Sequence, residues 1–108
     1  MKDFEAIVII SSDTTKNNLV KIDESFQKLI NEQNGSIVAK ENWGLRDLAY
    51  EIKSMKKGFY LYYQLNLDGQ KIINIKKNIS QNEKILRYLF IKVESHEKLP
   101  TKVMQTND

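Results

Sequence analysis

Few side chains in this sequence have the type and spacing that catalysis requires. His96 is the only histidine and lies near the C-terminus, where we expect a solvated side chain rather than a general base. The chain contains no cysteine, which excludes disulfides, thiolate metal sites and a cysteine nucleophile. The segment Ser11 to Asn18 follows the first apolar run and has no glycine, so it does not predict a phosphate-binding loop. We therefore expect no catalytic residue, no metal site, no cofactor and no enzymatic activity.

Basic and aromatic side chains between residues 42 and 63 favour a binding function instead. Arg46 lies close to Trp43, and an arginine in that setting can pair with a phosphate and stack on an aromatic ring. Lys53, Lys56 and Lys57 surround a predicted hairpin tip, where they could reach a nucleic-acid backbone. Both features also have ordinary structural explanations. Charged hairpin tips are common, and Trp43 could serve only as a plug over a bulge at Gly44.

The elements that must position these residues follow from hydrophobic periodicity. Apolar residues at spacings of three and four predict helices over 19–30 and 72–79. Residues 4–10 and 85–93 are apolar on both parities, which predicts strands covered on both sides. Residues 36–52 predict a long strand in which Ile37 and Ala39 share a face, and Gly44 shifts the phase before Tyr50. Residues 59–67 alternate with period two, as a strand does.

The order β-α-β-β-α-β predicts an α+β fold of the ferredoxin-like split βαβ type. Its four-stranded antiparallel sheet carries both helices on one face, because right-handed crossovers place them on the same side. The first and third strands should be central. The residues expected to face the helices are Phe4, Ala6, Val8 and Ile10 on the first strand, Phe59, Leu61, Tyr63, Leu65 and Leu67 on the third, and Leu86, Tyr88 and Phe90 on the fourth.

The opposite face of the sheet has no helix to cover it, and we call it the open face. A large apolar patch on a small domain usually marks an interaction surface. Half-exposed tyrosines also occur on sheets that bind nothing, so Tyr60 and Tyr62 alone would not decide the matter. The predicted partner-protein surface is Ile7, Ile9, Tyr50, Tyr60, Tyr62, Leu89 and Ile91.

Composition places the chain among ordinary globular domains. Its 108 residues suit one domain, and 17 basic against 14 acidic residues give a mild net charge of +3. The apolar run Ala6 to Ile10 is too short for a signal peptide, so we expect a cytoplasmic protein. From residue 94 onward the chain turns polar. We therefore expect a folded domain over 1–95 and a flexible C-terminal tail over 96–108.

Two motifs carry a resemblance to a known family. Residues 43–52 read WGLRDLAYEI and residues 57–60 read KGFY, and together they resemble the signature of the bacterial small-subunit ribosomal protein S-six family. The opening DFEAIVII and the late segment ILRYLFIKVE resemble that family's first and last strands. The similarity extends over residues 3–94. Asp47 and Glu51 depart from the family pattern and make this hairpin less basic.

The resemblance implies a structural constituent of the small ribosomal subunit, located in the cytoplasm on the ribosome. Members bind the central domain of small-subunit rRNA together with small-subunit ribosomal protein eighteen, and we expect a monomer outside the ribosome and no membrane contact. The rival interpretation is a free-standing regulatory or ligand-binding domain that dimerises through its open face. The predicted RNA-binding residues are Lys2, Trp43, Arg46, Lys53, Lys56, Lys57 and Arg87.

Overall fold

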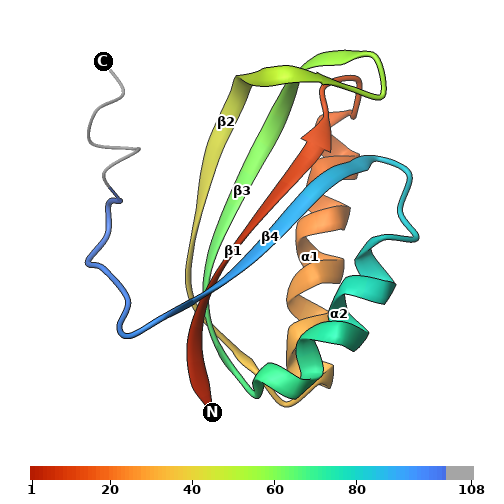
Figure 1. The fold of residues 1–108 in the computed structure, drawn as a ribbon. Helices are drawn as coiled ribbons and strands as arrows, with labels where there is room; N and C mark the ends of the chain where they lie inside the picture. Colours follow the sequence, from red (N-terminus) through yellow and green to blue (C-terminus); the bar gives the residue numbers. More distant parts are fainter. Residues whose placement is uncertain (102–108) are drawn as a thin grey trace.

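A single antiparallel sheet with two helices on one face makes up the protein, and the computed structural model describes residues 1–101 (Figure 1). The strands lie in the order β2-β3-β1-β4, which makes β1 and β3 central as predicted. The split βαβ fold expected from the sequence is therefore confirmed. The elements are β1 (Lys2–Ser11), α1 (Lys16–Glu32), β2 (Ser36–Ile52), β3 (Met55–Leu67), a 3-10 turn (Gly69–Lys71), α2 (Ile72–Ile79) and β4 (Ile85–Val93).

Local signals in the sequence account for both helix boundaries of α1. Thr15 Oγ1 accepts a hydrogen bond from the backbone N–H of Asn18 at 3.2 Å, which caps the first turn. The helix ends where Asn34 adopts φ 63° ahead of Gly35. A Cβ atom on Gly35 would lie 2.9 Å from Leu67 Cβ, so this turn requires glycine for space. The end of α1 and the end of β3 therefore pack in close contact.

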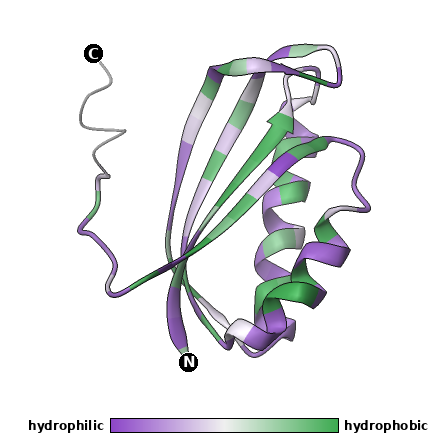
Figure 2. Ribbon diagram, in the orientation of Figure 1, coloured by the Kyte–Doolittle hydropathy of each residue, from purple (hydrophilic) through white to green (hydrophobic). Residues whose placement is uncertain are grey.

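The core lies between the helices and the sheet, and the predicted parity of β1 and β3 holds. Tyr63 is buried at the centre, with its ring 4.4 Å from that of Phe26. Its hydroxyl donates a 2.6 Å hydrogen bond to Asp23 Oδ1 of α1. In Figure 2 the second half of β1 is continuous green, because this central strand is apolar on both parities. The fully buried side chains include Val8, Ile10, Ile30, Tyr63, Leu65, Leu67 and Ile75.

Two predictions about side-chain direction are wrong, and β-bulges explain both. A register shift lies between Ile37, which pairs with Leu65, and Ala39, which pairs with Gln64. Because Leu65 and Gln64 point to opposite faces, Ile37 and Ala39 do too. A second shift between Ile9 and Ile10 places Ile85, not Leu86, at the start of the β4 core row. From residue 87 onward β4 has the predicted alternation.

Within residues 1–101, no helix is long and apolar enough to cross a lipid bilayer.

Candidate binding face

The open face divides into two halves with different chemistry. Over β2 and β3 it carries aromatic and polar side chains that are largely covered by other parts of the chain. Over β1 and β4 it carries mostly aliphatic side chains, of which Leu89 and Ile91 are accessible. The residues on the first half are Glu41, Trp43, Tyr60, Tyr62 and Gln64, and those on the second are Ile7, Ile9, Arg87, Leu89 and Ile91.

Stacked aromatic rings cover the β2/β3 half. The Trp43 indole lies 5.0 Å from the Tyr62 ring, at an interplanar angle of 12°, and 6.4 Å from the Tyr60 ring. Tyr62 is only 2% exposed, and its hydroxyl donates to Glu5 Oε2 at 2.7 Å. Burial and the neighbouring Glu5 carboxylate raise the pKa of Tyr62, so the hydroxyl stays protonated as a donor. Tyr62 points away from the helices as predicted, but the expectation that it is accessible is wrong.

The bulge predicted at Gly44 positions Trp43. Gly44 has φ +78°, a left-handed conformation that favours glycine, and its N–H donates to Asn42 Oδ1 at 2.8 Å. The extra residue lets Trp43 lie over β3, where its indole N–H donates to Glu41 Oε1 at 2.9 Å. Arg46 Nε donates to the Trp43 carbonyl at 3.0 Å, while Arg46 Nη2 is buried without a hydrogen-bond partner in the structure. Trp43 therefore has the structural role of covering the bulge and the neighbouring tyrosines. The same turn holds the Arg46 side chain through its Nε–H.

Residues 96–101, which we call the strap, pack on the same half of the open face. His96 Nε2 donates to the Leu65 carbonyl at 3.0 Å, and the His96 side chain is 12% exposed. The expectation of a solvated histidine is therefore wrong. Thr101, at 1% exposure, bonds through both its N–H and its hydroxyl to the Glu41 carboxylate. Flexibility of residues 96–108 as a whole stays a prediction, and residues 102–108 lie outside the described part.

The Glu41 carboxylate is the anchor of this arrangement. Burial alone would raise the pKa of Glu41, but hydrogen bonds from Thr101 and Trp43 outweigh it and hold that pKa below its ordinary value. Sequence reasoning missed Glu41, Gln64 and Thr101. Glu41 and Thr101 are far apart in the chain and belong to no motif, so no local signal pointed to their contact.

The β1/β4 half is open to solvent. Leu89 and Ile91 are 47% and 48% exposed, and Ile7, which pairs with Leu89 across the strands, is half-buried beside them. These three residues were predicted as a partner-protein surface, and they form a continuous aliphatic row. Ile9, from the same prediction, is only 6% exposed. A Cβ atom built on Gly58 would lie only 2.7 Å from Ile9 Cγ2, which shows how closely Ile9 packs against β3. This packing keeps the Ile9 side chain away from solvent.

An arginine–tyrosine pair joins the β2–β3 hairpin to this row. Arg87 Nη1 donates to the Tyr50 hydroxyl at 2.8 Å, and the guanidinium carbon lies 5.3 Å from the centre of the Tyr50 ring. Tyr50 itself is 61% exposed. The hairpin therefore reaches across the sheet, as its overhanging ribbon in Figure 1 shows, and brings Tyr50 to β4. Two residues predicted for different ligands, RNA and protein, are in fact in direct contact.

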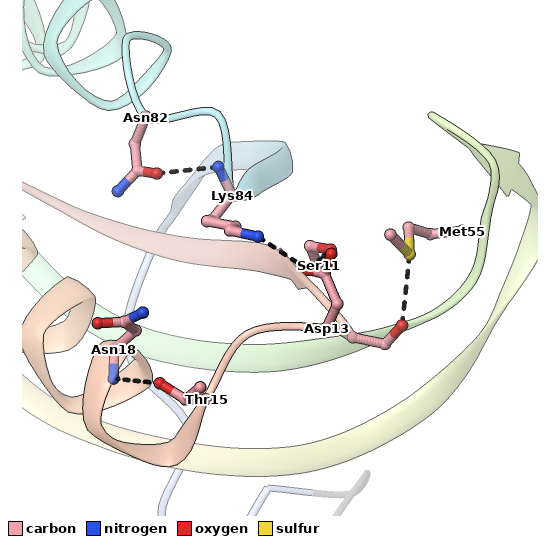
Figure 3. Close-up of polar contacts among 8 residues, drawn as sticks. Ser11, Asp13, Thr15, Asn18, Met55, Asn82 and Lys84 are labelled. Atoms are coloured by element: carbon pink, nitrogen blue, oxygen red, sulfur yellow. Dashed lines mark hydrogen bonds and ion pairs between the residues drawn. The ribbon is translucent and has the colours of Figure 1, made fainter.

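The hairpin tip carries the predicted basic residues. Lys53 and Ser54 both have positive φ, which forms a tight two-residue turn. Lys53, Lys56 and Lys57 are all exposed, and Lys57 makes a 3.7 Å surface ion pair with Asp47. Behind the tip, the Ser12 hydroxyl bonds to Met55 Sδ at 3.5 Å (Figure 3). The hairpin is thereby joined to the loop between β1 and α1.

Lys2 lies away from the other predicted RNA-binding residues. It pairs with Leu67 at the start of β1, whereas Arg87 pairs with Ile9 near the strand's other end. At about 3.3 Å per residue, the two positions are about 23 Å apart along β1. The structure therefore gathers Arg46, the hairpin lysines and Arg87 at one end of the sheet and leaves Lys2 at the other.

In combination, the fold and this face define a class: a split βαβ domain with both helices on one side of its sheet and no helix on the other. Among residues 1–101, no group of three or more histidine, cysteine or carboxylate side chains is placed to hold a metal ion. A basic end and an accessible aliphatic row are typical of binding surfaces.

Comparisons with known proteins give the family. The family model for ribosomal protein S6 matches residues 3–92, and the chain belongs to that family. It is 38% identical over 105 residues to the small ribosomal subunit protein bS6 of Rickettsia felis, covering 97% of this chain and 87% of that protein. It is also 38% identical over 107 residues to bS6 of Rickettsia bellii, covering 97% and 88%.

A solved structure gives the same result. The crystal structure of 30S ribosomal protein S6 from Thermotoga maritima superposes with a TM-score of 0.81 at 26% identity, covering 85% of this chain and 87% of that one. The resemblance found in the sequence motifs is therefore confirmed. Family membership supports the role of a structural constituent of the small ribosomal subunit.

Proposed function

We propose that this protein binds small-subunit rRNA, in its central domain, together with small-subunit ribosomal protein eighteen. The observation that carries the proposal is the accessible aliphatic row of Ile7, Leu89 and Ile91, which lies next to the Arg87–Tyr50 pair on a face that no helix covers. A protein partner would cover the row. The RNA would contact the basic end beside it.

The proposed RNA surface is the end of the sheet that carries the hairpin. Its exposed lysines can approach a phosphate backbone without first breaking buried contacts. Arg46 lies at the same end of the sheet, but its Nε is bonded to the Trp43 carbonyl and its Nη2 is buried, so a phosphate contact through Nη2 would require the side chain to move. Trp43 and Lys2 stay predictions. The Trp43 indole N–H is already bonded to Glu41, and Lys2 would need a second RNA contact at the far end.

The proposed cellular setting is the ribosome in the cytoplasm, with a monomer outside it. The strap and the hairpin leave only the β1/β4 half of the open face accessible to a second protein. That row has three aliphatic residues, of which Leu89 and Ile91 are about half exposed. Such a small apolar area favours binding to a different protein over formation of a stable homodimer.

A binding experiment with matched lysine variants tests the RNA part. Lys53 and Lys56 would be changed to alanine together, and Lys76 and Lys77 of α2, on the helix layer, serve as the control pair with the same loss of charge. We expect the hairpin variant to bind a central-domain rRNA fragment with protein eighteen at least about tenfold more weakly, and with a shallower salt dependence, because phosphate contacts release counterions. The control pair should change affinity little. Equal losses in both variants would mean that net charge, not the hairpin, drives binding.

A size measurement separates the proposal from the rival interpretation of a free-standing domain. The pure protein should be monomeric by sedimentation and should bind the RNA fragment much better when protein eighteen is added. A stable homodimer that is indifferent to this RNA would instead favour the rival.

A further inference from the structure

We infer that the strap, residues 96–101, stays on the sheet during partner binding and forms one wall of the partner site. The inference rests on the proposed function and adds to it by setting the limits of the docking surface. The partner would meet the β1/β4 row alone and would not enter the β2/β3 half. Its docking element must therefore be narrow enough to lie along two strands, with apolar side chains toward Ile7, Leu89 and Ile91.

Four hydrogen bonds fix the strap at both of its ends. At one end His96 Nε2 donates to the Leu65 carbonyl at 3.0 Å, and Gln64 Nε2 donates to the Glu97 carbonyl at 2.9 Å. At the other, Thr101 donates to the Glu41 carboxylate through its N–H at 3.0 Å and its hydroxyl at 2.6 Å. Thr101 is 1% exposed. The strap is therefore held at both ends, with Thr101 buried and the residues between the two ends at the surface.

The polar groups beneath the strap explain why a partner would not replace it. Gln64 is 3% exposed, and its side-chain amide also reaches the Tyr62 hydroxyl at 3.2 Å. If an apolar partner displaced the strap, the partly exposed Glu41 carboxylate and the buried Gln64 amide would lose these bonds and would be covered by apolar groups instead. A buried polar group without a partner, and still more a buried charge, is strongly unfavourable. The aliphatic row of the β1/β4 half carries no such penalty.

Cysteine bridging provides the test. The sequence has no cysteine, so Glu41→Cys and Thr101→Cys introduce the only two thiols in the chain. A short bis-thiol reagent would then fasten the strap to β2. Three proteins are compared for binding to purified small-subunit ribosomal protein eighteen: the unsubstituted chain, the double variant without the bridge, and the bridged double variant. Each single-cysteine variant, treated with the same reagent, controls for the modification itself.

We expect the bridged protein to bind protein eighteen within about twofold of the unsubstituted chain, because the wall stays in place in both. A loss of about tenfold or more on bridging, with binding retained by the unbridged variant, would overturn the inference, since it would show that the strap must leave. If the unsubstituted chain itself does not bind protein eighteen, the proposed function fails, and that result is distinct from a failure of the bridged form alone.

Hydrogen exchange gives a second measurement that needs no substitution. The Thr101 amide, bonded to Glu41, should exchange at least as slowly in the complex with protein eighteen as in the free protein. Faster exchange of this amide in the complex would show that the partner displaces the strap, and it would refute the inference.

Discussion

The two faces of this sheet are made from the same strands but differ in how much of their surface is covered. On the helix side, α1 and α2 cover the side chains of β1 and β3, and Ala6, Tyr63 and Leu65 are at most 1% exposed. On the open face, only the β2/β3 half is covered, by Trp43 and the strap, while Leu89 and Ile91 remain about half exposed. On the open face of the two inner strands and β4, Leu89 and Ile91 are thus the most accessible apolar side chains, although β2 also exposes Val38, Leu45 and Tyr50.

The largest expected effect comes from the helix-covered side. Leu65→Ala removes a fully buried side chain from the centre of β3, so the free energy of unfolding should fall by about 2–5 kcal/mol through lost burial and a residual cavity. Denaturant unfolding measures it. A change near zero would mean that this face is not the core and would remove the basis of the comparison.

The second-largest effect is expected at the contact between Gly58 and Ile9, which keeps Ile9 away from solvent. Gly58→Ala would place a Cβ 2.7 Å from Ile9 Cγ2 and 3.2 Å from the Ile10 carbonyl, where β3 pairs with the end of β1. Forcing atoms into a packed region destabilises by about 1–3 kcal/mol. Thermal unfolding would detect the loss. If the melting temperature were unchanged, the hairpin would be packed more loosely than described.

A third prediction concerns the polar link between the helix layer and the sheet. Burial opposes ionisation of Asp23, but hydrogen bonds from Lys40 and Tyr63 outweigh it and hold the pKa of Asp23 below its ordinary value of 3.8. Because the folded pKa is the lower one, this contribution to stability is complete above pH 3.8 and is lost as the pH falls through the folded pKa. Asp23→Asn should lower the free energy of unfolding by about 1 kcal/mol at neutral pH.

The comparison of Asp23→Asn with the unsubstituted protein should therefore converge in acid. Unfolding free energies measured from neutral pH downward would show the gap closing below pH 3.8. A gap that persisted in acid would mean that Asp23 contributes through shape and not through charge.

The smallest stability effect is expected on the exposed row. Leu89→Ala should change the free energy of unfolding by no more than about 0.5 kcal/mol, because half of the side chain is already in water. It should nevertheless weaken assembly with protein eighteen and rRNA. Ile73→Ala, an exposed isoleucine on α2, is the matched control and should leave both properties unchanged. Equal assembly losses for the two variants would argue against a localised docking row.

Arg87→Ala gives the same contrast for the basic end. Its bonds to Tyr50 are at the surface, so the melting temperature should hardly move, while assembly weakens. A large fall in melting temperature would show that the pair is structural.

Periodicity predicted much of the fold because it is a local property. Alternation along β3 fixed its two faces, and Gly44 marked a bulge that the register shift between Asn42 and Gly44 confirms. The bulge between Ile37 and Ala39 has no glycine to mark it, so its effect on direction was missed. The same is true of the shift that makes Ile85 a core residue.

The candidate face was predicted less completely, because what covers a residue depends on distant parts of the chain. Tyr62 and Ile9 point away from the helices as expected, yet neither is accessible. Tyr62 lies under Trp43, and the strap packs on the same half through contacts such as Thr101 to Glu41. Such contacts between a polar segment without periodicity and a distant strand leave no pattern in the sequence.

Methyl-group NMR of the complex with protein eighteen tests the central claim most directly. Signals of Ile7, Leu89 and Ile91 should shift on binding, while those of Val20 and Ile73, exposed on the helices, should stay where they are. Shifts confined to the helix residues, with the β4 signals unchanged, would contradict the account.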